Sequence, residues 1–505
     1  MTGTRGSEPV RLRHYVGGEW VPGSGPTFDS VNPATAEVVA TAPVGQADEV
    51  AAAVAAARSA ADAKMWSGAR AAERAAALEA LADALAARER EAGELIAREM
   101  GKPIRVARGR EVAGAIDRFR FFAGAARLLD GRFVGAPVDG LWDMEIPEPV
   151  GVAALIIPWN DPIDLLARKL GAALAAGCAV VIKPSELTPA STALVVELAH
   201  ELGTFPPGVV NLVHGPGDPT GDALVGREGV DKVAFTGSTQ TGARIMRRAA
   251  DRLARVSLEC GGKAPALVFP DADLDRCLDA LTYGAFMYSG QSCTACTRLI
   301  VHEDVADRVV AGIVERSRAL PTGDPMDPSM LVGPMASRAQ YDKTLRYLAL
   351  AKDEGGTVVV GGEAGDPDDL FLAPTVIADL ALDSRLHQEE IFGPILTVHR
   401  FADEDDALAA ANATPFGLGG SVWTRDIDRA LRVARSLDVA DVWVNGYYLR
   451  HAETTFGGRH RSGIGRELGL RGIEEYVSWK RVCIDTRQEE FHLKRWFEAA
   501  EDFQG

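Results

Sequence analysis

The stretch GVAALIIPWNDPIDLLARKLGAALAAGCAVVIKP, residues 151–184, contains a predicted strand, a helix and a second strand in immediate succession. GVAALIIP and AVVIKP are short apolar runs that end in proline, as strands buried on both faces often do. Between them, LLARKLGAALAAG has helical spacing and ends at glycine. This order predicts a doubly wound parallel sheet, which binds ligands where the carboxyl ends of its strands open into a crevice.

The same alternation continues on the carboxyl side through TALVVELAHELG, GVVNLVHG and DKVAFTGS. It restarts after residue 262 at APALVF and runs through RLIVHEDV, TVVVGG and PILTVHRF, which predicts a second α/β domain. On the amino side, residues 47–99 are rich in Ala, Glu and Arg at helical spacing. They predict two or three amphipathic helices on a larger body. An exposed coiled coil is the alternative, but Leu or Ile is not sustained at heptad spacing.

The composition limits the classes of protein. A chain of 505 residues with 47% apolar side chains forms more than one core. The formal net charge of −17 argues against nucleic acid as a partner. Six cysteines without a paired framework indicate a reducing compartment, and the polar start MTGTRGSEPVRLRHY shows no secretory signal. The apolar runs are shorter than a membrane helix needs. We therefore expect a cytoplasmic protein with no membrane partner.

Polar motifs follow several of the predicted strands, and each has two interpretations. Asn160 in PWN can donate to a developing oxyanion, or be a turn residue beside a packed tryptophan. Lys183 and Glu186 in KPSE can hold a ribose, or form a solvated turn before a helix. Gly237 and Ser238 in FTGS can bind a diphosphate at a helix amino terminus, or simply start that helix.

Two further stretches carry candidate chemistry. Glu259, in LECGG, is a candidate general base or an unremarkable loop residue. The glycines of GPGDPTG, residues 215–221, are spaced one residue too widely for a dinucleotide fingerprint, so we predict a plain turn. Cys293 and Cys296, in GQSCTACTRL, are a redox pair, half of a metal site, or one nucleophile and a bystander. Without a second pair at zinc spacing, a metal is not expected.

Taken together and in order, PWN, KPSE, FTGS, LECGGK, GQSC, EEIFGPI, TPFGL and FGG…SGIGRELG resemble the NAD(P)-dependent aldehyde dehydrogenase superfamily. The resemblance extends from about residue 15 to residue 482. It implies an α/β fold with a Rossmann-type cofactor domain, a second α/β catalytic domain and a β oligomerisation arm. The expected ranges are 1–128 and 150–260 for the NAD-binding domain, 261–470 for the catalytic domain, and 129–149 and 471–505 for the arm and tail.

The resemblance also implies catalytic roles. Cys293 would be the nucleophile that forms a thiohemiacetal and then a thioester, and Asn160 would hold the oxyanion. Glu259 would activate the hydrolytic water, with Lys169 and Glu467 relaying protons around it. Cys296 would then be a small buried side chain or a reversible disulfide partner of Cys293. Cys260 replaces a usual leucine and would be a packing substitution.

For the cofactor, the resemblance implies NAD, with NADP possible. The residues that match cofactor-binding positions are Trp159, Lys183, Glu186, Gly237, Ser238, Gly242, Glu390 and Phe392. Lys183 and Glu186 would hold the adenosine ribose, where a carboxylate disfavours a 2′-phosphate. Glu390 would hold the nicotinamide ribose, and Phe392 would pack by the nicotinamide.

The substrate mouth departs most from the family pattern. Asp161, Asp164, Arg168, Arg450 and Phe456 fall at positions that line it. Arg168 would anchor the carboxylate of a semialdehyde, with Arg450 nearby. Alternatively, Asp161 and Asp164 neutralise it and the substrate is a neutral aromatic or aliphatic aldehyde; Asp164 and Arg168 are four apart on one helix face.

Two other functions remain open on this fold. An acylating enzyme would pass the thioester to coenzyme A, although such members commonly lack the base at Glu259. A catalytically silent binding or structural protein would not need Cys293, Asn160 and Glu259 together. The small-molecule aldehyde is the expected partner, in a homodimer or homotetramer. FHLKRWFEAA, residues 491–500, has helical spacing in the tail.

Overall fold

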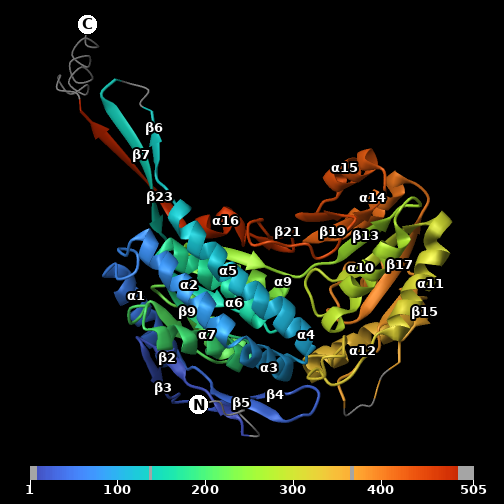
Figure 1. The fold of residues 1–505 in the computed structure, drawn as a ribbon, viewed down its shortest axis with the longest axis horizontal. Coiled ribbons are helices and arrows are strands. Elements are labelled where there is room, and N and C mark those ends of the chain that lie inside the picture. Colours follow the sequence, from blue (N-terminus) through green and yellow to red (C-terminus); the bar gives the residue numbers. More distant parts are fainter. Residues whose placement is uncertain (1–7, 136–138, 364, 366–368, 487–505) are drawn as a thin grey trace.

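The computed structural model describes residues 8–135, 139–363, 365 and 369–486. Two α/β bodies lie side by side, and a three-stranded arm projects away from the first of them (Figure 1). The predicted tail helix at residues 491–500 lies outside the described residues. Among the described residues, no helix combines the length and the apolar character needed to cross a bilayer.

The first body is built on an eight-stranded sheet of order β22-β12-β11-β8-β9-β10-β2-β3. Its five central strands are parallel: β12 (Arg255–Glu259), β11 (Lys232–Thr236), β8 (Val152–Ile156), β9 (Ala179–Lys183) and β10 (Val210–Leu212). Every residue of β8 and β9 is buried, because helices cover both faces of the sheet. This confirms the doubly wound sheet that residues 151–184 predict.

Helices enter and leave this sheet at the residues that the sequence marks. Helix α6 (Pro162–Ala176) begins with proline in its first turn and ends at Gly177, whose φ is +98°. Helix α7 (Pro189–Leu202) starts the same way and ends at Gly203. Proline has no N–H to leave unpaired in a first turn, and glycine adopts the left-handed ending without strain. The loops that connect β8 to α6 and β9 to α7 therefore lie at the same edge of the sheet, where both strands end.

The Ala-rich amino-terminal segment forms α1 (Ala47–Asp62), α2 (Ala71–Ala87) and α3 (Glu89–Met100). Helices α1 to α3 each bury one side, and Val50, Leu78 and Ile96 are fully buried in the core of the first body. The predicted amphipathic helices are therefore confirmed. The coiled-coil alternative is wrong, because α1 packs against the sheet and the buried sides of α2 and α3 pack against other helices of the same body.

The second body has a seven-stranded sheet of order β15-β16-β17-β14-β13-β19-β20, in which only β15 is antiparallel. Its strands are β13 (Ala264–Val268), β14 (Cys296–His302), β15 (Thr357–Val360), β16 (Thr375–Ala378), β17 (Ile395–Phe401), β19 (Gly419–Trp423) and β20 (Asp441–Val444). The helices around it are α10 (Leu274–Phe286), α11 (Glu303–Ala319), α12 (Arg338–Asp353), α13 (Arg385–Gln388), α14 (Glu404–Asn412) and α15 (Ile427–Ser436). The second α/β domain is thus confirmed.

One short strand crosses between the bodies. β22 (Gly463–Ile464) falls within the range 261–470 expected for the catalytic domain, yet it pairs with β12 of the first sheet through Leu258↔Ile464. The Cys260 amide also donates to the Ser462 carbonyl at 2.8 Å. The chain therefore returns to the first sheet before residue 470, because that sheet leaves the edge of β12 open for an added strand.

The arm forms from two segments that are distant in the sequence. β6 (Arg132–Val134) and β7 (Leu141–Pro149) make the predicted hairpin, and β23 (Val477–Asp485) pairs with the whole of β7. The arm extends away from both bodies (Figure 1). Its geometry matches the β arm expected at residues 129–149 and beyond 471.

The remaining elements are short or peripheral. They are β1 (Val10–Arg11), β2 (His14–Val16), β3 (Glu19–Val21), β4 (Thr27–Val31), β5 (Val38–Pro43), α4 (Ile104–Val106), η1 (Ala107–Val112), α5 (Ala113–Ala125), η2 (Ala126–Leu128), η3 (Gly217–Gly221), α8 (Asp222–Gly226), α9 (Thr239–Ala250), η4 (Met287–Gly290), β18 (Phe416–Gly417), β21 (Arg459–His460) and α16 (Gly469–Glu474).

Candidate active site

Cys293 lies in the loop between η4 and β14, where the two bodies meet. Its side chain is half-buried and packs against the core of the first body, although its own strand belongs to the second. The turn before it is tightly coiled, since Tyr288 and Ser289 both have positive φ. Gln291 anchors this turn by accepting from the Ala336 amide at 2.9 Å and donating to the Tyr288 carbonyl at 3.2 Å. The thiol is thus held at a junction between domains.

The glycine pair after β12 brings Glu259 to the same junction. A Cβ added to Gly262 would stand 2.5 Å from the carbonyl oxygen of Cys293, which is closer than real side chains approach. A Cβ on Gly261 would collide with the carboxylate of Glu390. Both positions therefore need glycine, because the backbone of this loop touches the Cys293 loop on one side and Glu390 on the other.

Asn160 follows β8 and is buried. Its side-chain amide donates to the Gln291 carbonyl at 3.2 Å, so it reaches the Cys293 loop from the first body. The amide has a second N–H that can donate to a substrate oxygen. The structure therefore brings the predicted oxyanion donor to the predicted nucleophile from a different domain.

Glu259 is buried, with 4% of its surface exposed. Neither carboxylate oxygen has a hydrogen-bond partner among the described residues. Burial first, and the nearby Glu467 second, raise the pKa of Glu259 well above its usual range, against the pull of Lys169 and Arg168. A buried carboxyl with free oxygens and a raised pKa has the properties of a general base that works near neutral pH.

Lys169 and Glu467 form a buried pair behind Glu259. The Lys169 ammonium donates to the Glu467 carboxylate and, at 2.5 Å, to the hydroxyl of Thr236. Glu467 arrives next to this lysine because its backbone pairs with that of Phe456 in an isolated bridge. The second oxygen of Glu467 is buried without a hydrogen-bond partner in the described part of the chain. The two residues form a polar connection beside the carboxyl of Glu259.

On the substrate side, Arg168 is paired within its own helix. Its guanidinium donates to Asp164 through Nε at 2.9 Å and Nη2 at 2.5 Å, and Arg118 contacts the other oxygen of Asp164 at 2.7 Å. These two arginines hold the pKa of Asp164 at about 2 despite its burial, which acts in the opposite direction. Of the two alternatives for Arg168, the structure has the one in which an aspartate neutralises it.

Asp161 does not share in this pairing. It accepts from the Lys102 ammonium at 2.6 Å and from the Tyr288 hydroxyl at 3.3 Å. Lys102 also binds Glu111, and both are buried. The expectation that Asp161 pairs with Arg168 is wrong, because Asp161 precedes α6 and faces the buried Lys102, which lies in the connection between α3 and α4.

Arg450 and Phe456 lie next to each other at this side of the site. The Arg450 guanidinium lies 4.4 Å from the centre of the Phe456 ring, and that of Arg168 lies 5.3 Å from it. Arg450 donates to the Thr294 hydroxyl, directly after Cys293. Arg168 and Arg450 thus share the ring of Phe456, whereas Asp161 is paired with Lys102.

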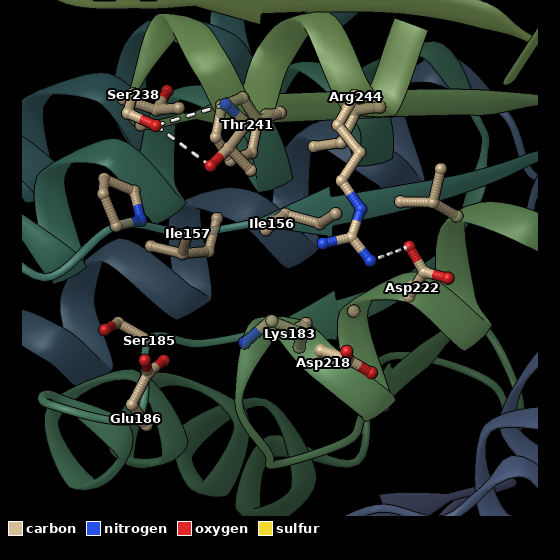
Figure 2. A pocket seen from close by; sticks show the side chains of 18 of the residues that line it. Ile156, Ile157, Lys183, Ser185, Glu186, Asp218, Asp222, Ser238, Thr241 and Arg244 are labelled. Atoms are coloured by element: carbon tan, nitrogen blue, oxygen red, sulfur yellow. Dashed lines mark hydrogen bonds and ion pairs between the residues drawn. The ribbon is translucent and has the colours of Figure 1, made fainter. Parts of the chain in front are cut away.

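A pocket of about 400 Å³ opens at the carboxyl ends of β8, β9 and β11 (Figure 2). Five of the eight expected cofactor residues line it, namely Trp159, Lys183, Glu186, Gly237 and Ser238. The Lys183 ammonium donates to the carbonyls of Pro184 and Gly215 at 2.7 Å each. Burial lowers the pKa of Lys183 to about 8, with Glu186 acting in the other direction. Lys183 is therefore a buried donor and no part of a solvated turn.

Ser238 caps α9 at the far wall of this pocket. Its hydroxyl accepts from the Thr241 amide at 3.2 Å and contacts the Thr241 hydroxyl at 2.9 Å (Figure 2). The amide groups of the first turn of a helix attract anions. Gly237 has no room for a side chain, since an added Cβ would overlap the Phe235 ring. This wall fits a diphosphate.

The other three expected cofactor residues lie outside the pocket wall. Gly242 is in the first turn of α9, where an added Cβ would contact the Cys260 sulfur at 2.8 Å. Glu390 accepts from the Gly262 amide at 3.1 Å. Phe392 makes an edge contact with the Trp159 ring at 5.3 Å. Glu390 and Phe392 thus connect the pocket to the Cys293 loop, as the two ends of a dinucleotide site require.

Comparison with known proteins decides the family. The sequence model that describes the aldehyde dehydrogenase family matches residues 20–482 of this chain. The chain belongs to this family.

Similar proteins match over nearly the whole length. Hydroxyisobutyraldehyde dehydrogenase of Mycolicibacterium austroafricanum is 40% identical over 487 residues, with 95% of each chain covered. The crystal structure of betaine aldehyde dehydrogenase from Staphylococcus aureus in complex with NAD+ superposes with a TM-score of 0.93, 36% identity and 95% of each chain covered. An NAD-dependent aldehyde dehydrogenase from Sinorhizobium meliloti has a TM-score of 0.94 and 38% identity, covering 97% of this chain and 98% of its own. The expected superfamily, fold and aldehyde-oxidising enzyme class are confirmed.

Some residues of this aldehyde dehydrogenase that shape its pocket were not expected. Arg244 forms an ion pair with Asp222 across the pocket at 2.8 Å (Figure 2). Ser238, Thr241, Arg244 and Arg248 all line the pocket, and their three- and four-residue spacing on α9 could have indicated a common face. The loop 215–221 also contributes to the wall, so the predicted plain turn is wrong: the segment coils into η3 and faces the pocket.

The two neighbouring thiols have different surroundings. Cys296 is fully buried in the core of the second body with Ala266 and Leu299, whereas Cys293 borders the core of the first. Cys296 is a free thiol whose pKa burial raises to about 12. Cys260 is likewise buried, against Gly242. These positions favour Cys293 as the working thiol and the other two as packing residues.

The protonation of Cys293 leads to a prediction about its reactivity. Burial raises the pKa of the thiol to about 11, while Arg450 and Arg168 favour the thiolate. Only the thiolate is alkylated, so without cofactor the rate of iodoacetamide labelling should rise about tenfold per pH unit between about pH 7 and pH 9. The measurement is mass-spectrometric labelling in a Cys483→Ser background, which removes the exposed thiol. A labelling rate that levels off below about pH 8 would contradict a raised pKa.

Proposed function

We propose that Cys293, Asn160 and Glu259 oxidise an aldehyde to its carboxylic acid through a covalent intermediate on Cys293. The observation that carries this proposal is the convergence of the three residues at the domain junction. Asn160 donates into the Cys293 loop, and Gly262, three residues after Glu259, lies against the Cys293 carbonyl. The aldehyde is a small molecule, and NAD is the hydride acceptor in this reaction.

The first step uses the thiolate of Cys293. Its sulfur forms a bond to the aldehyde carbon, and the carbonyl oxygen becomes an alkoxide. The side-chain amide of Asn160 and the backbone N–H of Cys293 donate to that oxygen, where negative charge develops. Arg450 and Arg168 favour the thiolate against burial. The thiohemiacetal carbon keeps its hydrogen, which leaves with two electrons when the carbonyl re-forms as a thioester.

The second step uses the carboxylate of Glu259. Its oxygens are free of hydrogen bonds within the described residues, so one of them can take a proton from water. The oxygen of that water bonds to the thioester carbon, the C–S bond breaks, and the acid leaves. The carboxylate of Glu467, which is paired with the Lys169 ammonium, would take the proton from Glu259. Because the pKa of Glu259 is raised, hydrolysis should become faster as pH rises through that pKa.

The pocket fits NAD, whose nicotinamide accepts the hydride when bound. Lys183 and Glu186 would bind the adenosine ribose, and Ser238 with the first turn of α9 would bind the diphosphate. Glu390 would hold the nicotinamide ribose. Trp159 and Phe392, which are in contact, would flank the nicotinamide. The fit rests on the pocket volume of about 400 Å³ and on the first turn of α9, which begins beside Ser238 in the pocket lining.

A spectrophotometric assay tests this function. Purified protein, NAD and a neutral aldehyde such as pentanal should produce reduced nicotinamide and free acid without coenzyme A. Production that depends on coenzyme A would favour the acylating alternative. Neither product, in protein that binds NAD, would favour a silent binding protein and overturn the proposal.

Cofactor choice gives a second test. Glu186 is exposed at the edge of the pocket, with the cationic Arg244 also in its lining. Removing this carboxylate should favour a 2′-phosphate, so Glu186→Ser is expected to raise the NADP to NAD ratio of kcat/KM by about tenfold. The matched control is Glu201→Ser, an exposed glutamate at the end of α7. An unchanged ratio in Glu186→Ser would mean that this carboxylate does not face the ribose.

We also infer a homodimer, or a tetramer of dimers, in a reducing cytoplasmic setting. The arm exposes large apolar side chains: Phe133 60%, Trp142 54%, Trp479 48% and Ile484 43%. The second sheet ends at β20, whose outer edge is unpaired in the described chain and can accept a strand from a second copy. All six cysteines are free thiols, as a reducing compartment favours.

Light scattering at micromolar concentration should give at least the mass of a dimer. The paired substitution Trp142→Asp and Trp479→Asp places charges on the arm, and it should lower that mass while the far-ultraviolet circular dichroism stays the same. A parent protein that is monomeric in the same experiment would show that the arm does not join subunits.

A further inference from the structure

Two arginines beside the active site have no carboxylate partner in the described structure. Arg110 donates through Nη1 to the Tyr288 hydroxyl at 3.3 Å and to the Met287 sulfur at 3.2 Å, and its other nitrogens have no hydrogen bond there. Arg450 donates to the Thr294 hydroxyl, while its Nε is buried without a partner among the described residues. Both side chains are half-buried, so a ligand can reach them.

Tyr448 brings the two guanidinium groups together. The centre of its ring lies 4.6 Å from the guanidinium carbon of Arg110 and 5.7 Å from the guanidinium carbon of Arg450. Tyr448 has a positive φ of 55°, which is unfavourable for a residue with a side chain. Trp443 supports this loop by donating from its indole to the Leu449 carbonyl at 2.9 Å. The loop therefore holds the tyrosine ring close to two cations from distant parts of the chain.

This cationic pair lies next to the nucleophile. Arg450 contacts Thr294, which follows Cys293, and its charge reaches the thiol. Arg110 touches Tyr288, five residues before Cys293. A molecule whose carbonyl reaches Cys293 would thus extend toward both guanidinium groups.

The neighbouring cations are already neutralised. Arg118 and Arg168 share Asp164, Lys102 binds Asp161 and Glu111, and Lys169 binds Glu467. Buried or half-buried guanidinium groups are costly without an anion, and a carboxylate can bind them with strong charge-assisted hydrogen bonds. Arg110 and Arg450 are thus the two cations of this cluster whose charge an incoming anion would neutralise.

We propose that Arg110 and Arg450 bind the carboxylate of an aldehyde acid whose carbonyl carbon reacts at Cys293. This inference rests on the proposed function and assigns its substrate class. Arg168, the anchor suggested by the sequence, is not the recognising group because Asp164 occupies two of its donors. A cationic aldehyde would meet two unpaired guanidinium groups at the same place and be repelled.

The test compares three aldehydes with the parent enzyme and NAD. Succinic semialdehyde carries a carboxylate, pentanal is neutral, and betaine aldehyde carries a quaternary ammonium. We expect kcat/KM to be about 10- to 100-fold higher for the semialdehyde than for the other two, as a hydrogen-bonded charge commonly supplies. Arg110→Leu should remove that advantage and leave pentanal within about twofold, whereas Arg110→Lys should restore part of it.

Arg105→Leu is the matched control. Arg105 is an exposed arginine on the preceding turn, α4, and its loss changes the net charge equally without altering the cluster around Tyr448. Parallel changes on all aldehydes in Arg110→Leu, or a parent enzyme that prefers pentanal or betaine aldehyde, would overturn the anion site. A parent enzyme that oxidises none of the three aldehydes would instead overturn the proposed function itself.

A second measurement does not depend on turnover. Succinate should slow the alkylation of Cys293 by iodoacetamide in the parent protein and in Arg105→Leu, because it occupies the site next to the thiol. The same concentration of butyramide, which is uncharged, should protect much less. Equal protection of the parent and of Arg110→Leu by succinate would overturn the proposal even if Arg110→Leu were inactive for other reasons.

Discussion

A Cys293→Ala variant is expected to lose aldehyde oxidation by at least about a thousandfold, because no other group in the site can form the covalent adduct. Binding of NAD should stay within about twofold of the parent value, since Cys293 does not line the cofactor pocket. The measurements are kcat/KM for pentanal and the equilibrium dissociation constant for NAD, both on protein whose melting temperature has been checked.

The control for this variant is Cys296→Ala. Cys296 is three residues away, fully buried, and separated from Cys293 by its place in the core of the second body. Its loss should cost stability and leave kcat near the parent value. More than about a tenth of parent turnover in Cys293→Ala, or equal losses in both variants, would remove Cys293 from the role of nucleophile.

A Glu259→Gln variant is expected to release one equivalent of reduced nicotinamide rapidly and then turn over slowly. The first step needs the thiolate and the oxyanion donors, whereas hydrolysis needs a base that glutamine cannot provide. We expect the steady-state rate to fall by about 100-fold or more while the amplitude of the burst approaches the enzyme concentration. Rapid mixing with absorbance detection of reduced nicotinamide measures both.

Glu99→Gln provides the comparison for Glu259→Gln. Glu99 is also buried, and burial raises its pKa to about 7 although it accepts hydrogen bonds from Ala190 and Ser191. It lies in α3, and its carboxylate holds the start of α7 rather than the Cys293 loop. Its substitution should lower the melting temperature. The steady-state rate should stay near the parent value, with no initial burst of reduced nicotinamide. Equal loss of burst and steady state in Glu259→Gln would show that Glu259 acts before hydrolysis.

Much of the fold follows from local pattern. β8, α6 and β9 appear where residues 151–184 change from apolar runs to helical spacing and back, because Pro162 and Gly177 end one element and start the next. The arm shows the limit of such reasoning. β7 can be predicted as half of a hairpin, but the pairing of β23 along its whole length depends on contacts between residues more than 300 positions apart.

The sequence predicts which residue types stand at the strand ends of the site, but most of the contacts between them cannot be predicted from it. Asn160, Glu259 and Cys293 were expected to act together, and the structure brings their loops into contact. The partner of Asp161 could not be predicted, since Lys102 precedes it by 59 positions and lies in the connection between α3 and α4. Arg168 and Asp164 could be paired because their spacing places them on one helix face.

Two features were missed because their signal is not local. The loop 215–221 has glycine spacing that no fingerprint matches, and only its coiling into η3 turns it toward the pocket. The approach of Arg110 to Tyr448 joins η1 to a loop near the end of the chain. Arg450 was expected at the substrate mouth, but Arg110 stands in no motif, so charge balance within the folded site was needed to single it out.

The most direct test of the central claim is the site of the covalent intermediate. Glu259→Gln protein is mixed with NAD and pentanal, quenched in acid within the burst, digested, and analysed by mass spectrometry. We expect an added acyl group, as a thioester, on the peptide that contains Cys293, and none on the peptides with Cys178, Cys260 or Cys277. Fragmentation should place it on Cys293 and leave Cys296 unmodified. A full burst of reduced nicotinamide with no acyl group on Cys293, or with the group on another residue, would contradict the account.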